Sequence, residues 1–173
     1  MITMTNNNII FNIRTIFLDE WPIFKKLRLS ALLESPELFG GSYEDESKLS
    51  LSAFKANFKN FVVFGAFIGD ELVGSICFYR HHFFKMNHRG FLFFLYVKAN
   101  NRKQGIANAL IQSAINYAKF KIEQIHVSVI TINDIALKLY KKHKFEIYAI
   151  EPRVLKLNKI YYDEYKLILY IKK

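Results

Sequence analysis

The residues from 102 to 107 have the types and the spacing of an anion-binding turn. They read Arg102-Lys103-Gln104-Gly105-Ile106-Ala107 and lie between an apolar run, Phe91 to Val97, and a segment with helical periodicity. The first backbone N–H groups of a helix lack intrahelical partners, and the helix dipole places partial positive charge there. Gly105 has no Cβ to hold an anion away, and Arg102 and Lys103 add full charge. This turn suits a pyrophosphate, and an ordinary loop eased by a glycine is the alternative.

The two common phosphate-binding fingerprints are missing from the sequence. No G-x-x-x-x-G-K-[ST] pattern occurs, and Gly105 alone cannot satisfy G-x-G-x-x-G. These absences argue against an NTPase and against a dinucleotide-dependent dehydrogenase.

The elements that position this turn form a mixed α/β pattern. Apolar runs predict strands at residues 9–17, 61–68, 72–79, 91–97, 125–130, 145–150 and 165–171. Helical spacing predicts helices after a cap at Asp19, near residues 51–58, and at residues 106–117 and 133–140. Gly69-Asp70 predicts a tight hairpin turn, and residues 80–89 read as a loop. The order of elements favours one mixed sheet with helices on both faces, an α/β or α+β fold.

The length and composition are those of one cytoplasmic domain. The 173 residues contain 51% hydrophobic residues, which is enough for a substantial core. We expect a single domain over residues 1–173 in which residues 1–8 are loose. The one cysteine, Cys77, excludes an intrachain disulfide and a cysteine-based zinc site, and no metal site is expected. The first residues do not resemble a secretory signal, and no apolar run is long enough to span a membrane.

The formal net charge is +10, which favours anionic partners in general. The basic residues are scattered, and the densest stretch runs only from Lys138 to Lys144. Nucleic-acid binding is therefore the less favoured use of this charge.

Two motifs in order resemble the GNAT superfamily of acyl-CoA-dependent N-acyltransferases. Arg102, Gly105 and Ala107 match the family's R/Q-x-x-G-x-G/A signature, directly after the run that ends Leu95-Tyr96-Val97. Downstream, Asn133-x-x-Ala136-x-x-Leu139-Tyr140, followed by Phe145, resembles the segment N-x-x-A-x-x-L-Y…G-F. The resemblance extends over roughly residues 9–171 and includes His88, before the central strand.

The resemblance implies a fold and a cofactor site. The fold is a GNAT-like mixed sheet of about seven strands, in which the parallel strands 91–97 and 125–130 splay apart. Acetyl-CoA (coenzyme A) is the implied co-substrate. Its pantetheine arm would pair with main-chain groups of Leu95, Tyr96 and Val97, and Asn133 would position that arm. Its pyrophosphate would bind the turn of Arg102 and the amides of Lys103, Gln104, Gly105, Ile106 and Ala107.

Tyr140 is the implied catalytic residue. A phenol near the thioester sulfur can act as general acid toward the departing thiolate. The alternative is a core tyrosine on a helix stripe, and for Asn133 the alternative or additional role is a helix cap.

The sequence departs from the family pattern at two places. Lys144 replaces the glycine before Phe145, which strains the chain by about 1 kcal/mol if that position needs positive φ. The central strand carries no glutamate that could act as general base, so a water chain or another residue must serve. His88 is the first choice, since a neutral imidazole accepts a proton near pH 7. The other candidates are Glu34, Glu44, His81, His82 and Glu151.

We therefore expect an N-acetyltransferase that transfers an acetyl group from acetyl-CoA to a primary amine by direct attack in a ternary complex. The acceptor would be a small-molecule amine or a protein or peptide amine, with no membrane partner. Loop aromatics could line its pocket: Phe39, Tyr43, Phe83, Phe84, Tyr161 and Tyr162. The alternative is a non-catalytic acyl-CoA-binding module or a basic nucleic-acid- or ribosome-associated module on the same fold. An exposed terminal strand would offer an edge for a homodimer.

Overall fold

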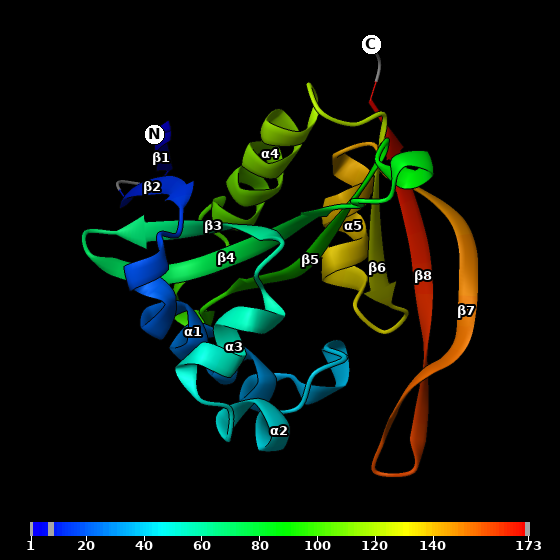
Figure 1. Ribbon diagram of the computed structural model, residues 1–173, viewed down its shortest axis with the longest axis horizontal. Helices are drawn as coiled ribbons and strands as arrows, with labels where there is room; N and C mark the ends of the chain where they lie inside the picture. Colours follow the sequence, from blue (N-terminus) through cyan, green and yellow to red (C-terminus); the bar gives the residue numbers. More distant parts are fainter. Residues whose placement is uncertain (1, 7–8, 172–173) are drawn as a thin grey trace.

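The computed structural model describes residues 2–6 and 9–171, and over these ranges the chain forms one mixed sheet (Figure 1). The sheet has eight strands in the order β1-β2-β3-β4-β5-β6-β8-β7. Their bounds are β1 Ile2–Asn6, β2 Ile9–Thr15, β3 Phe61–Ile68, β4 Glu71–Arg80, β5 Arg89–Val97, β6 Gln124–Ile130, β7 Glu146–Leu157 and β8 Ile160–Tyr170. Among these strands only β5 and β6 pair in parallel.

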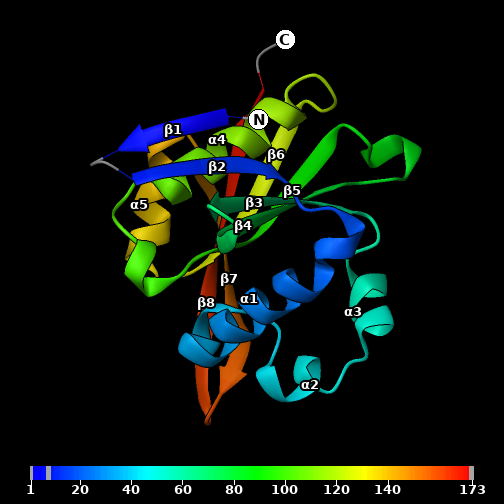
Figure 2. The same cartoon turned by 90° about the vertical axis from the view of Figure 1, so that its left-hand side faces the viewer.

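Helices lie on both faces of the sheet, so that two hydrophobic cores form. Figure 2 shows α1 (Trp21–Glu34), α2 (Tyr43–Ser47) and α3 (Leu51–Asn57) on one side and α4 (Ile106–Ala118) on the other. The larger core joins α4 and α5 (Asp134–Lys142) to the sheet. The smaller core is largely aromatic, with Trp21, Phe24 and Phe54 packed edge-on or tilted. No helix within the described ranges is long and apolar enough to cross a membrane.

The parallel pairing of β5 with β6 stops halfway along both strands. Registered pairs run from Arg89↔Gln124 to Leu92↔Val127 and no further. At the same level β5 has a bulge against β4, where two residues, Phe94 and Leu95, lie opposite Ile76 alone. Phe94 has the positive φ of 49° that such a bulge produces. The bulge bends β5, and the remaining parts of the two strands are left unpaired with each other.

The mixed architecture, the splayed parallel strands and the hairpin turn at Gly69, with φ 56°, are confirmed. The eighth strand beyond the expected seven is β1. Residues 2–6 form it by pairing with β2, in place of the loose start expected there, and residues 1, 7 and 8 lie outside the described ranges. The predicted Asp19 cap is wrong, because α1 begins at Trp21 after Glu20, whose carboxylate accepts from the Phe17 N–H. The short helix α2 was not predicted, since its sequence is charged and carries no apolar stripe.

Lys144 follows α5 with φ 67°, so the strain expected for a side chain at this position is present. Lys144→Gly should raise the free energy of unfolding by about 0.5–1 kcal/mol relative to Lys144→Ala, because only glycine removes the Cβ clash. Urea denaturation of the two variants measures the difference. A glycine variant no more stable than the alanine variant would contradict the strain.

Candidate active site

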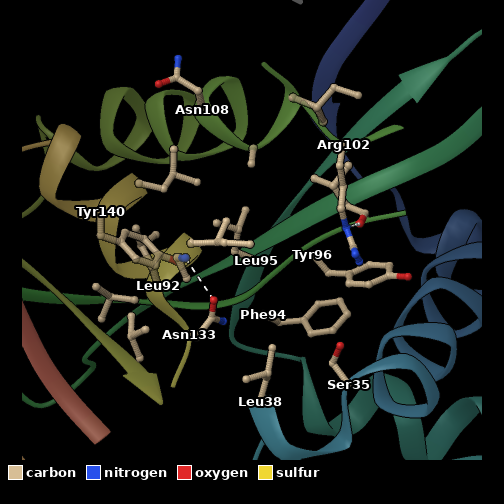
Figure 3. A pocket seen from close by; sticks show the side chains of 18 of the residues that line it. Ser35, Leu38, Leu92, Phe94, Leu95, Tyr96, Arg102, Asn108, Asn133 and Tyr140 are labelled. Carbon is tan, nitrogen blue, oxygen red and sulfur yellow. Dashed lines mark hydrogen bonds between the residues drawn. The ribbon is translucent and has the colours of Figure 1, made fainter. Parts of the chain in front are cut away.

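The opening between β5 and β6 continues into a cavity of about 600 Å³ (Figure 3). Its walls are the unpaired ends of β5 and β6, the first turns of α4 and α5, and the loop after α1. The predicted site residues that line it are Leu95, Tyr96, Val97, Arg102, Lys103, Gly105, Ile106, Ala107, Asn133 and Tyr140. The structure thus brings ten of the predicted residues together around one space.

The turn before α4 presents a series of free backbone N–H groups. Within the described residues, the N–H groups of residues 103–108 make no hydrogen bond, and the first helical bond is donated by Ala109 to Gly105. Gly105 is the N-cap of α4, with φ 82°, and no side chain caps the helix. Lys103 also has a positive φ, of 61°. These free donors at the start of a 13-residue helix fit a diphosphate.

Arg102 is held within the protein rather than left free for an anion. Its Nε donates to the Val97 carbonyl oxygen at 3.0 Å, and its terminal nitrogen pairs with the Glu34 carboxylate. The Tyr96 hydroxyl donates to the other oxygen of Glu34 at 2.6 Å. Arg102 therefore ties the turn to β5 and to the end of α1, and its charge is compensated by Glu34.

These contacts also shift the pKa values of Glu34 and Tyr96. The hydrogen bond from Tyr96, followed by that from Arg102, lowers the pKa of Glu34. Burial, and then the bond to Glu34, raises the pKa of Tyr96 to about 12. Glu34 is an ionised hydrogen-bond acceptor and is poorly suited to take a proton near neutral pH.

Tyr140 lies at the opposite end of the cavity from Arg102 (Figure 3). Its side chain is 3% exposed, and its ring packs edge-on against Phe145 at 5.4 Å between centroids. Burial raises the pKa of Tyr140, so its phenol is protonated at neutral pH. Its hydroxyl makes no hydrogen bond within the described residues, which leaves the proton available for donation.

Asn133 caps α5, as the alternative interpretation of this residue predicted. Its Oδ1 accepts from the Ala136 N–H at 3.1 Å, while the side chain also borders the cavity. Gln104 does not line the cavity. The side-chain Nε2 of Gln104 donates to the Asn100 carbonyl oxygen at 3.3 Å, so Gln104 stabilises the turn without facing the cavity.

His88 does not lie at this cavity. It precedes β5 and borders a separate surface hollow with Lys119 and Glu123, at the end of the strand away from the splay. A side chain at the amino end of β5 cannot reach the opening beyond Leu92, so the geometry does not support His88 as the base. The other candidates Glu44, His81, His82 and Glu151 are also absent from the lining, which in the described chain contains no carboxylate and no imidazole.

Sequence reasoning missed several lining residues. Ser128 of β6 and Phe93 of β5 both line the cavity, and each is exposed in a strand whose neighbouring residues are mostly buried. Strand alternation could have pointed to Ser128, but Phe93 lies in a continuous apolar run. Ser35, Leu38 and Phe39 come from the loop after α1, and of these only Phe39 was expected to line a pocket.

The sequence matches the model of the acetyltransferase (GNAT) family over residues 14–145. The chain therefore belongs to the GNAT family of acetyltransferases, has the fold of that family, and is an acetyl-CoA-dependent N-acetyltransferase in general. The expected co-substrate, acetyl-CoA, is confirmed by this membership. A comparison with curated proteins gives no match.

Solved structures show the same fold at low sequence identity. A GNAT acetyltransferase from Streptococcus pneumoniae is 19% identical, with a TM-score of 0.83 over 94% of this chain and 99% of that one. The yncA protein of Salmonella typhimurium, solved with its cofactor acetyl-CoA, is 14% identical, with a TM-score of 0.81 over 94% and 95%. The ribosomal-protein-S18-alanine N-acetyltransferase of Escherichia coli is 14% identical, with a TM-score of 0.73 over the same shares.

Gly105→Ala should weaken coenzyme A binding by at least about tenfold, because a Cβ at φ 82° moves the free N–H groups away from their present positions. Isothermal titration calorimetry measures the Kd. Gly69→Ala is the matched control, since Gly69 also has positive φ but lies in an open hairpin turn. Equal affinities of the two variants would contradict the binding role of the turn.

Proposed function

We propose that this protein transfers the acetyl group of acetyl-CoA to a primary amine by direct attack in a ternary complex. The observation that carries the proposal is the row of free N–H groups at residues 103–108, beside a strand opening that ends at Tyr140. When bound, acetyl-CoA supplies a thioester, so that the amine nitrogen bonds to the carbonyl carbon as the carbon–sulfur bond breaks.

The free N–H groups of the turn would bind the diphosphate of coenzyme A, and the unpaired edge of β5 would bind its extended pantetheine arm. The β6-facing edge of β5 beyond Leu92 has main-chain groups without a strand partner, which supports pairing of the arm with Leu95, Tyr96 and Val97. Asn133 would position the arm from the start of α5. Arg102 acts indirectly, by fixing the turn through Glu34 and the Val97 carbonyl.

Tyr140 donates a proton to the departing thiolate in this proposal. Its buried, protonated phenol lacks a competing acceptor within the described residues, and both properties suit a general acid. The amine proton leaves through water, because no carboxylate or imidazole among the described residues lines the cavity.

Tyr140→Phe should lower kcat by about 10²–10⁴-fold and change the Kd for coenzyme A by less than about threefold, because the substitution removes only the donated proton. Thiol-release kinetics give kcat and calorimetry gives the Kd. A parallel loss of affinity and rate would remove Tyr140 from the acid role. Coenzyme A binding without thiol release by the wild type, over a broad amine panel, would instead favour the non-catalytic module.

The pH dependence of kcat/KM should follow the acceptor and not the enzyme. Only the neutral amine attacks, and no carboxylate or imidazole of the described residues lines the cavity, so kcat/KM should rise with pH up to the pKa of the amine used. Profiles for two amines of different pKa test this, and their midpoints should differ accordingly. A common midpoint near 6–7 for both amines would reveal an imidazole base.

A further inference from the structure

A continuous row of rings crosses the sheet on the face opposite α4. The aromatic row consists of Phe61, Tyr79, Phe91, His126 and Tyr148, which come from β3, β4, β5, β6 and β7. Tyr79 is registered with both Phe61 and Phe91, and Phe91 with His126, so the sheet itself aligns these four rings. Tyr148 lies on β7, which β8 separates from β6.

Neighbouring rings of the row are in contact throughout. The ring centroids of Phe61 and Tyr79 are 5.4 Å apart, and those of Tyr79 and Phe91 are 6.2 Å apart. Phe91 stacks on His126 at 5.2 Å, and Tyr148 packs edge-on against His126 at 5.7 Å. His126 is buried beneath these rings, while Tyr148 is 54% exposed. The row therefore forms a firm aromatic floor that is partly open to solvent.

Phe93 connects this floor to the acetyl-transfer cavity. It lines the cavity, is 44% exposed, and stacks on Phe91 at 6.1 Å. Residues 89, 91 and 93 share one face of β5 because side chains alternate along a strand. A molecule that reaches the cavity over this face passes along Phe91 and Phe93.

The guanidinium of Arg89 is a cation at the end of the floor away from the cavity. Its guanidinium lies 5.4 Å from the centre of the Phe91 ring, and its Nε donates to His126 Nε2 at 3.3 Å. Arg89 forms no ion pair within the described residues, so its terminal N–H groups can bind an anion. Burial, followed by the charges of Arg89 and His88, lowers the pKa of His126 to about 4, which leaves Arg89 as the cation of this pair at neutral pH.

At the opposite end of the same face, the cluster of Lys166, Glu151 and Glu164 carries more negative than positive charge. Lys166 bonds to Ser128 Oγ, a cavity group, at 3.2 Å. Its ammonium also pairs with Glu151 at 2.7 Å and with Glu164 at 2.5 Å, so two carboxylates surround one cation. The face thus offers a negative end beside the cavity, an aromatic middle and a positive far end.

We propose that this face is the acceptor subsite and that it selects amines carried on an aromatic body with an anionic group at the far end. The inference rests on the proposed function and adds the substrate class to it. The amine would lie at the cavity, the aromatic body on Phe91 and Phe93, and the anion on Arg89. Phe93 lies four positions after Arg89, roughly 13 Å along an extended strand, and the acceptor and the Arg89 side chain together must span this distance.

Three amines test the proposal: 4-(2-aminoethyl)benzoate, 2-phenylethylamine and n-butylamine. The wild type should show kcat/KM falling by about tenfold at each step in that order. Phe91→Leu should lower kcat/KM by about tenfold for the two aromatic amines only, and Arg89→Gln by about tenfold for the benzoate only. Phe84→Leu is the matched control, since Phe84 is 88% exposed and outside the row, and it should leave all three values unchanged.

Calorimetry of 4-(2-aminoethyl)benzoate on the coenzyme A-saturated protein separates this inference from the proposed function. Binding that Phe91→Leu and Arg89→Gln weaken, without thiol release from any amine, would overturn the proposed function and support the subsite. Thiol release at equal kcat/KM from all three amines would overturn the subsite and support the proposed function. Absence of benzoate binding, or equal binding by wild type and Phe91→Leu, would also overturn the subsite.

Discussion

The site depends on the loss of backbone pairing between β5 and β6 beyond Leu92 and Val127. Inside a sheet, an unpaired N–H or C=O costs about as much as a lost hydrogen bond, so a strand interior normally stays paired. Here the bulge at Phe94 and Leu95 bends β5 away from β6 and keeps its pairing with β4. The opening is therefore fixed by the sheet itself. An extended part of a ligand can hydrogen-bond to β5 there in place of β6.

The turn before α4 presents main-chain donors to the cavity, whereas the charge of Arg102 is already paired. The expected cation, Arg102, is neutralised by Glu34, while the free N–H groups of residues 103–108 remain. The Glu34 carboxylate is shared by Arg102 and Tyr96, which joins the end of α1, strand β5 and the turn before α4. Together, Glu34, Tyr96 and Arg102 hold the turn in the conformation that leaves its N–H groups exposed. The same sheet carries an aromatic floor on its other face, so cofactor and acceptor would approach the opening from different sides.

The sequence predicted the elements whose signals are local. The turn at residues 102–107, the cap at Asn133, the hairpin at Gly69 and the strained Lys144 follow from residue types that require particular backbone geometry. The location of His88 was misjudged because its position in the chain near β5 does not tell which end of the strand meets the opening. The Arg102–Glu34 pair spans 68 positions and Ser128–Lys166 spans 38, and no local pattern foretells such contacts. The same limit hid the aromatic row, since its rings come from five separate strands.

Amide hydrogen exchange at residues 103–108 tests the central claim most directly, with coenzyme A and pantetheine as the two ligands. The free N–H groups should exchange quickly in the unliganded protein and become protected by coenzyme A, which carries the diphosphate. Pantetheine, which lacks the diphosphate, should leave these amides unprotected even when it fills the strand opening. Equal protection by both ligands, or slow exchange before any ligand is added, would contradict the role of this turn.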